Sequence, residues 1–254
     1  MKVTFLGTGT SSGVPSITCD CRVCTSEDPR DNRTRPSILM EWDGHVVLVD
    51  TSSDFRQQAL RTGMHRLDAV LYTHAHADHI MGLDDIRIFN WRQRMAMPAY
   101  GQQEALDAVA RTFWYVFEDT QKGGGKPLVD MHPVDGPFEL LGRTVTPVPV
   151  FHGEMPIYGY RVGNFAYLTD VSRVPDESLD LLQGVEVVVL SALRPTPHST
   201  HMCVDQAIEL AGKIGAEETF FTHMCHDILH AETDAELPDG IRLAYDGLVL
   251  DNLV

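Results

Sequence analysis

The segment THAHADH, residues 73–79, decides how this sequence is interpreted. Directly after the hydrophobic stretch LDAVLY it offers four potential metal ligands within six positions, namely His74, His76, Asp78 and His79. Imidazole and carboxylate are groups that Zn²⁺, Mn²⁺ and Fe²⁺ accept. Because side chains at i and i+2 of an extended segment point the same way, His74 and His76 would face one point. A polar turn with Asp78 as helix cap is the alternative, but four such groups in one loop favour a metal site.

Strand and helix patterns alternate along the whole chain, which indicates an α/β protein. Strands are expected at 3–9, 37–50 (a hairpin turning at Asp43-Gly44), 67–74, 138–150, 157–170 (turning at Gly163-Asn164), 185–192, 218–223 and 242–250. Helices are expected at 54–63, 101–117, 176–184 and 203–215, and a loop at the Gly-rich 122–127. We expect one domain, residues 1–254, with two β-rich halves each covered by helices, as in a four-layer αββα sandwich.

The composition limits the partners that the protein can have. The 254 residues include 36 acidic and 20 basic side chains, a formal net charge of −16. Such a surface repels a long polyanion, so nucleic acid is a disfavoured partner, whereas a small anion bound through a metal remains compatible. No stretch approaches the ~18 apolar residues of a membrane span, and the N-terminal residues are expected to form a strand rather than a secretory signal. We therefore expect a cytoplasmic protein that does not bind membranes.

Three of the five cysteines form a C-x-C-x₂-C cluster at Cys19, Cys21 and Cys24. A disulfide between Cys19 and Cys21 would close a tight and strained ring. In a cytoplasmic protein of this length, clustered cysteines are more often metal ligands, and three thiolates supply most of a tetrahedral Zn²⁺ site. Incidental reduced thiols are the alternative. The candidates for a fourth ligand are Cys203, Cys225, His226 and His230.

The order His-x-His-x-Asp-His resembles the signature of the metallo-β-lactamase superfamily. Further ligands of that family are expected at later strand ends, and candidates follow in the right order at His152 in PVFHGEM, Asp170 in AYLTDVS and His223 in FFTHMCH. The segments FLGTGTSSG and VLVDTS are also similar to the family, so the resemblance covers essentially the whole chain. It implies the αββα sandwich with two mixed β-sheets flanked by helices.

The resemblance also implies a binuclear centre of two divalent ions, Zn²⁺ or Mn²⁺. One ion would be held by His74, His76 and His152, the other by Asp78, His79 and His223, with Asp170 bridging both. Asp50 resembles a carboxylate that orients a ligand histidine in this family, although a capping or turn role is equally open. His76 stands where redox di-iron relatives carry glutamate, which favours hydrolysis over redox chemistry.

The cysteine cluster narrows the resemblance to one branch of this superfamily. The segment GTGTSSGVPSITCDCRVC is similar to the PhnP-type phosphodiesterases of the carbon–phosphorus lyase pathway, in which such a cluster and a histidine three residues after the last active-site histidine hold a structural zinc. This implies a zinc-binding loop at about 16–30, with ligands Cys19, Cys21, Cys24 and His226, and leaves Cys225 as the competing fourth ligand. The relatives also place a general acid where His201 stands, 22 positions before His223. A structural role at the following helix is the alternative, and His198 is a weaker candidate.

The resemblance implies a binuclear phosphodiesterase with Asp78 and His201 as catalytic residues. A metal-bridging hydroxide would attack a small, cyclic phosphodiester such as phosphoribosyl 1,2-cyclic phosphate, and a homodimer is suggested. Three alternatives remain. They are an endoribonuclease of the tRNA-processing type, a hydrolase of esters, thioesters or lactones, and a non-catalytic accessory protein like those of pyrroloquinoline quinone synthesis.

Overall fold

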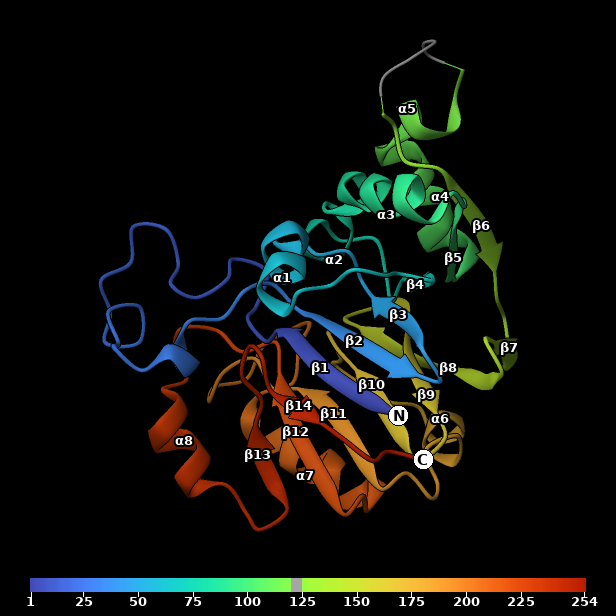
Figure 1. The fold of residues 1–254 in the computed structure, drawn as a ribbon. Helices are drawn as coiled ribbons and strands as arrows, with labels where there is room; N and C mark the ends of the chain where they lie inside the picture. The colour runs from blue at the N-terminus through green and yellow to red at the C-terminus, as the bar shows by residue number, and fades with distance from the viewer. Residues whose placement is uncertain (120–124) are drawn as a thin grey trace.

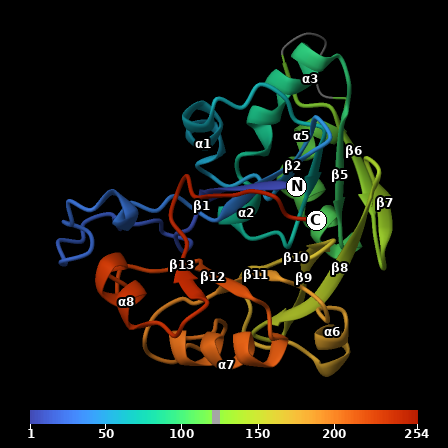
Figure 2. The same cartoon turned by 60° about the horizontal axis from the view of Figure 1, so that its bottom comes forward.

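Two β-sheets of seven strands each face one another at the centre of the structure (Figure 1). The structure is a computed structural model that describes residues 1–119 and 125–254. The loop expected at 122–127 therefore lies partly outside the described residues. Helices cover the outer face of each sheet, so the architecture is the expected four-layer αββα sandwich (Figure 2).

The first sheet has the strand order β14-β1-β2-β3-β4-β5-β6. Its strands are β1 (Lys2–Gly7), β2 (Ser37–Trp42), β3 (His45–Val49), β4 (Ala69–Leu71), β5 (Met97–Gly101), β6 (Val129–Pro133) and β14 (Val249–Leu250). Pairing is antiparallel from β14 to β3 and parallel from β3 to β6. The β2–β3 hairpin turns at Asp43-Gly44, as the sequence predicts.

The second sheet has the order β13-β12-β11-β10-β9-β8-β7. Its strands are β7 (Phe138–Leu140), β8 (Arg143–His152), β9 (Met155–Val162), β10 (Phe165–Leu168), β11 (Val187–Ser191), β12 (Glu218–Thr222) and β13 (Ile241–Leu243). Strands β13 to β10 are parallel and β10 to β7 antiparallel, so both sheets are mixed.

The helices lie in two outer layers. Over the first sheet lie α1 (Phe55–Thr62), α2 (Ala77–Ile80), α3 (Arg87–Gln93), α4 (Gln103–Thr112), α5 (Trp114–Phe117) and the 3₁₀ turn η2 (Leu83–Ile86); over the second lie α6 (Asp176–Asp180), α7 (Val204–Ile214) and α8 (His230–Glu236) (Figure 2). A further 3₁₀ turn, η1 (Pro29–Asp31), belongs to the long connection between β1 and β2, residues 8–36, which carries the cysteines and is called the N-terminal loop below. None of the described helices is both long and apolar enough to cross a membrane.

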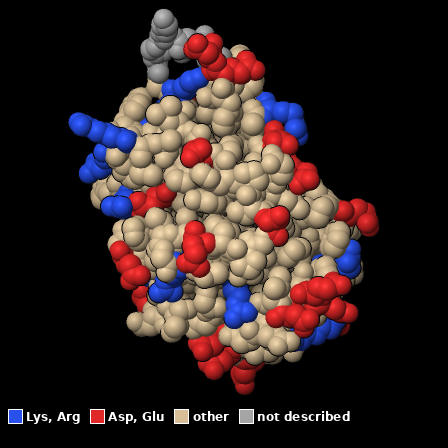
Figure 3. Space-filling view, turned by 90° about the vertical axis from the view of Figure 1, so that its right-hand side faces the viewer, with Lys and Arg blue, Asp and Glu red and all other residues tan. Residues whose placement is uncertain are grey.

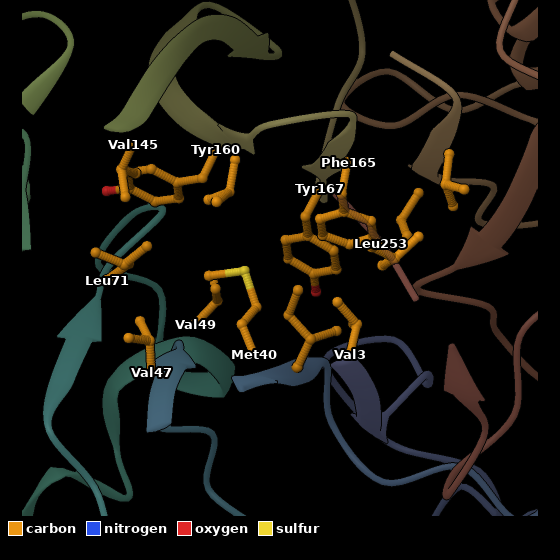
Figure 4. Packing of buried hydrophobic residues seen from close by; sticks show 14 of the residues in the cluster. Val3, Met40, Val47, Val49, Leu71, Val145, Tyr160, Phe165, Tyr167 and Leu253 are labelled. Atoms are coloured by element: carbon orange, nitrogen blue, oxygen red, sulfur yellow. The ribbon is translucent and has the colours of Figure 1, made fainter. Parts of the chain in front are cut away.

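The main core fills the space between the two sheets. Val3, Met40 and Leu71 of the first sheet face Tyr160 and Phe165 of the second, and all five are at most 1% exposed (Figure 4). One further apolar cluster lies between each sheet and the helices that cover it. Because both faces of each sheet are covered, inner strands such as β11 are buried at every position and show no alternation of buried and exposed residues.

The prediction of one strand at 242–250 is wrong, because this segment contributes two separate strands to different sheets. In the structure β13 pairs with β12, and β14 pairs with β1. The chain changes sheet at Asp246, whose carboxylate accepts hydrogen bonds from Thr8 and Thr34 of the first half. The next residue, Gly247, has a φ of 93°, which suits glycine.

Two other elements are also divided. The helix expected at 101–117 is broken at Phe113, where ψ of 41° ends α4 before α5 begins. The strand expected at 138–150 is a hairpin of β7 and β8 that turns at Leu141-Gly142, both with positive φ.

Candidate binuclear metal centre

Most of the polar groups of the site lie at or just after the ends of strands of both sheets, and Asp78 and His79 lie in the short helix α2. Asp50 follows β3, His74 follows β4, Asp170 follows β10 and His223 follows β12. The carboxyl ends of neighbouring parallel strands meet at one edge of a sheet, so each sheet delivers polar groups to the same end of the molecule. Asp50, Asp170 and His223 have φ values of 64°, 58° and 59°. This left-handed backbone is costly for non-glycine residues, by about 1–3 kcal/mol each, and is typical of functional sites.

The first cluster consists of His74, His76, His152 and Asp170, each offering a ligand atom within 4.8 Å of the others. His74 and His152 are buried, whereas His76 is exposed, so this cluster is the more open of the two. His152 Nδ1 lies 2.7 Å from the backbone oxygen of Thr200 and donates to it, which leaves Nε2 free to face the cluster.

The second cluster consists of Asp78, His79, Asp170 and His223, again with ligand atoms within 4.8 Å of one another. All four are buried. Asp170 Oδ1 lies 3.4 Å from His79 Nε2 and 3.2 Å from His223 Nε2. Asp170 therefore belongs to both clusters, and the seven residues expected from the sequence are brought together around it.

Asp50 lies behind the second cluster and holds one of its histidines. Its Oδ2 accepts a hydrogen bond from His79 Nδ1 at 2.7 Å, and this contact turns His79 Nε2 toward Asp170. Asp50 is itself held by Thr73, whose backbone N–H and hydroxyl donate to its two oxygens at 2.9 and 2.8 Å. Of the two roles that the sequence leaves open for Asp50, the geometry favours the orienting one.

The donor atoms of both clusters fit divalent cations. Among the described residues, the buried atoms His74 Nε2, Asp78 Oδ2, His79 Nε2 and His223 Nε2 have no hydrogen-bond partner. Buried polar atoms are rarely left unpaired, because desolvation without a partner is costly, and a cation at each cluster would satisfy them. Mixed imidazole and carboxylate donors suit Zn²⁺ or Mn²⁺.

The electrostatics of the clusters point the same way. Burial lowers the pKa of His74 well below its usual value, so its imidazole is neutral, as a metal ligand must be. Burial alone would raise the pKa of Asp170, but His223 and His79 outweigh it and hold that pKa well below the usual range. Burial likewise opposes a charge on His79, yet Asp170 and Asp50 raise its pKa well above the usual value. The second cluster therefore favours positive charge, which a bound cation would supply in place of the proton.

The cysteine cluster is assembled with His226. The Sγ atoms of Cys19, Cys21 and Cys24 lie 3.1, 3.5 and 3.6 Å from His226 Nδ1, and all five cysteines are free thiols. Ligands of a tetrahedral Zn²⁺ with bonds of ~2.0–2.3 Å are separated by about 3.5 Å, so the spacing fits zinc. The backbone N–H of Cys24 donates to Cys21 Sγ and lowers the pKa of Cys21 to about 6, which favours the thiolate.

The other candidates for the fourth ligand point elsewhere. Cys225 Sγ contacts Asp227 Oδ2 at 3.5 Å. Cys203 is the N-cap residue of α7. His230 is buried against Tyr245, and its backbone N–H donates to Asp31. The structure therefore brings only His226, among these candidates, to the three cysteines.

A buried arginine that the sequence analysis missed holds the cysteine loop in place. Arg33 is 1% exposed, forms an ion pair with Asp31 at 2.9 Å, and donates to the backbone oxygens of Cys225 and Ile228. It thereby joins the N-terminal loop, which projects beside α8 in Figure 1, to the segment that carries His226. A single arginine in a loop gives no sequence signal for such burial.

His201 lies between the two clusters. Its ring centroid is 4.5 Å from that of His152, and it stacks on His223 at 4.8 Å. Burial, together with nearby His223, lowers the pKa of His201 to about 3. His201 is therefore neutral in the free protein, in contrast to the pKa near ~6.5 of an unperturbed histidine.

Comparison with known proteins identifies the family. The family description "Beta-lactamase superfamily domain" matches residues 45–224. The chain belongs to the metallo-β-lactamase superfamily. Within this superfamily, the crystal structure of a diphosphatase from the PhnP family superimposes with a TM-score of 0.92 and 47% identity, covering 99% of this chain and 97% of that one. The resemblance noted in the sequence is thus confirmed at the level of the family.

Two curated relatives of this metallo-β-lactamase protein carry other names. An octanoyltransferase of Porphyromonas gingivalis is 42% identical over 253 residues, which are 98% of this chain but only 51% of that protein. A ribonuclease Z of Mycobacterium marinum is 28% identical over 267 residues, covering 92% of this chain and 90% of that protein. This chain therefore spans about half the length of the octanoyltransferase.

Proposed function

We propose that this metallo-β-lactamase hydrolase cleaves a small anionic phosphodiester. The observation that carries the proposal is the position of Asp170, which is shared by two clusters of candidate ligands. A carboxylate shared in this way would hold two cations close to one another. A pair of cations can bind two oxygens of one phosphoryl group, as in two-metal phosphoryl-transfer sites generally.

In this proposal each ion has its own set of ligands. His74, His76 and His152 would hold one ion, Asp78, His79 and His223 the other, and Asp170 both. When bound, such ions lower the pKa of water toward about 7 and polarise phosphoryl oxygens. The two carboxylates, Asp78 and Asp170, would neutralise only part of the charge of two divalent ions. The remaining positive charge favours an anionic substrate.

His201 would protonate the oxygen that leaves phosphorus. Its ring lies beside both clusters, at 4.5 Å from His152 and 4.8 Å from His223. Since its pKa in the free protein is lowered to about 3, this role requires the pKa of His201 to rise when the anionic substrate is bound. Negative charge developing on the departing oxygen acts in that direction.

The substrate we favour is a cyclic phosphodiester such as phosphoribosyl 1,2-cyclic phosphate. A second candidate is a diphosphate, because the PhnP-family relative at 47% identity is a diphosphatase. Both reactions break a phosphorus–oxygen bond. In the phosphodiester that oxygen leads to carbon, and in the diphosphate it leads to a second phosphorus. We also propose a structural zinc held by Cys19, Cys21, Cys24 and His226, and a homodimer, which light scattering on the eluting protein would test.

The functions suggested by the names of two relatives receive less support. The ribonuclease Z relative supports RNA cleavage, but the net charge of −16 disfavours RNA, and acidic and basic side chains are interspersed on the face shown in Figure 3. The octanoyltransferase extends well beyond the part that this chain matches. Its name therefore supports only a test of ester and thioester hydrolysis.

A turnover screen of the metal-loaded protein tests the proposal. It compares bis(4-nitrophenyl) phosphate, 4-nitrophenyl phosphate, a diphosphate diester, a lactone and an octanoyl thioester, with Zn²⁺ and with Mn²⁺. We expect the phosphodiester to be cleaved well above the monoester. Absence of phosphodiester and diphosphate turnover with both metals, or faster thioester cleavage, would overturn it.

A further inference from the structure

His198 lies one ring further out from the metal clusters than His201. The two ring centroids are 5.3 Å apart, and the His198 side chain is partly exposed, whereas His201 is packed against His152 and His223. His198 therefore lies at the rim of the site, beside the residue proposed to protonate the leaving oxygen.

The loop that carries His198 is tied to the site through Thr200. The Thr200 backbone oxygen accepts from His152 Nδ1 at 2.7 Å, while its backbone N–H donates to His198 Nδ1 at 3.3 Å. One residue thus orients a candidate metal ligand and the rim histidine together. Arg194 fixes the same loop by donating to the backbone oxygens of Thr196 and Pro197 at 3.1 and 2.8 Å.

These contacts determine what His198 offers to a substrate. Because its Nδ1 accepts the Thr200 N–H, the neutral ring carries its proton on Nε2. No described residue hydrogen-bonds to this Nε2, so it remains a free donor at the rim. The positive charge of Arg194 also acts on this ring, in a chain whose net charge is −16.

We propose that His198 contacts the substrate and donates its Nε2–H to a second phosphate, outside the phosphoryl group that is cleaved. The inference rests on the proposed function, since it assumes a phosphorylated substrate at the clusters. It makes His198 a determinant of specificity for substrates with two phosphates. A hydrogen bond to a charged group of this kind changes affinity by about ten- to hundredfold.

Calorimetric binding to the metal-loaded protein tests this inference without turnover. The probes are thymidine 5′-phosphate and thymidine 3′,5′-bisphosphate, which differ by one phosphate. We expect the wild type to bind the bisphosphate more tightly, His198→Ala to lose that gain by about ten- to hundredfold, and His198→Gln to restore most of it because its amide still donates. His132→Ala, on the edge strand β6, is the control and should match the wild type.

The outcomes separate the two claims. Equal binding of both probes by the wild type, or a bisphosphate gain that survives in His198→Ala at unchanged metal content, overturns the inference. Absence of turnover in the screen above, with the His198-dependent gain still present, overturns the proposed function and leaves the phosphate contact standing.

Discussion

His223 and His226 lie three residues apart on the loop after β12, yet they face different clusters. His223 Nε2 lies 3.2 Å from Asp170 Oδ1, and His226 Nδ1 lies 3.1 Å from Cys19 Sγ. One short segment therefore belongs to both the candidate binuclear centre and the cysteine cluster. The N-terminal loop is thereby anchored next to the site.

The cysteine cluster should hold one metal ion that is independent of the other two. We expect Cys21→Ser to reduce the zinc-plus-manganese content from about three ions per chain to about two, measured by plasma mass spectrometry. Cys203→Ser, which alters a buried cysteine outside the cluster, should keep all three. Retention of three ions in Cys21→Ser would show that the cysteines do not bind metal.

Removing the side chain of the buried Arg33 should lower the stability of the protein strongly. Arg33→Met leaves Asp31 buried without its partner. We therefore expect the free energy of unfolding, measured by urea denaturation, to fall by about 3–5 kcal/mol. Arg30→Met removes a partly exposed ion pair with Asp28 and should cost at most about 1 kcal/mol. Equal losses in the two variants would contradict the anchoring role of Arg33.

Asp50 should act on the metal through His79. Asp50→Asn weakens the contact that orients His79, and we expect metal affinity or kcat to fall about 10- to 100-fold. Asp68→Asn, at the opposite end of β4, serves as the control and should leave metal affinity unchanged. A fully loaded and fully active Asp50→Asn protein would assign Asp50 to the turn alone.

His201 should affect the chemical step rather than metal binding. We expect His201→Ala to lower kcat for phosphodiester cleavage by about 10²- to 10⁴-fold while metal content stays at the wild-type level. His132→Ala provides the matched control. Loss of metal in His201→Ala would indicate a structural role instead.

Much of the fold could be predicted from the sequence because the inner strands of both sheets are buried on two faces and many strand ends are marked by turn residues, whereas β5 and β6 are not among the expected strands. The hairpin at Asp43-Gly44 and the helix that ends at Gly63 are examples, since glycine takes the positive φ that each requires. The last strand was predicted wrongly because its apolar pattern continues across Asp246, whose contacts with Thr8 and Thr34 come from distant segments.

The candidate ligands were also accessible from the sequence, since they occur in the order of the family at or near the ends of strands. The contacts that orient them were not. Thr73 acts through its backbone N–H and hydroxyl, Thr200 through its backbone oxygen and Arg33 through its buried side chain, and none of these contacts leaves a motif in the sequence. The lowered pKa of His201 likewise depends on burial and on packing against His223 that only the folded chain supplies.

A metal titration tests the central claim most directly. Metal-free protein, with zinc first restored to the cysteine cluster, is titrated with Mn²⁺ while hydrolysis of bis(4-nitrophenyl) phosphate is followed. If two ions share Asp170, activity should appear only as the second equivalent binds, and Asp170→Asn should abolish it. Full activity at one equivalent, or no phosphodiester cleavage at two, would contradict a binuclear phosphodiesterase.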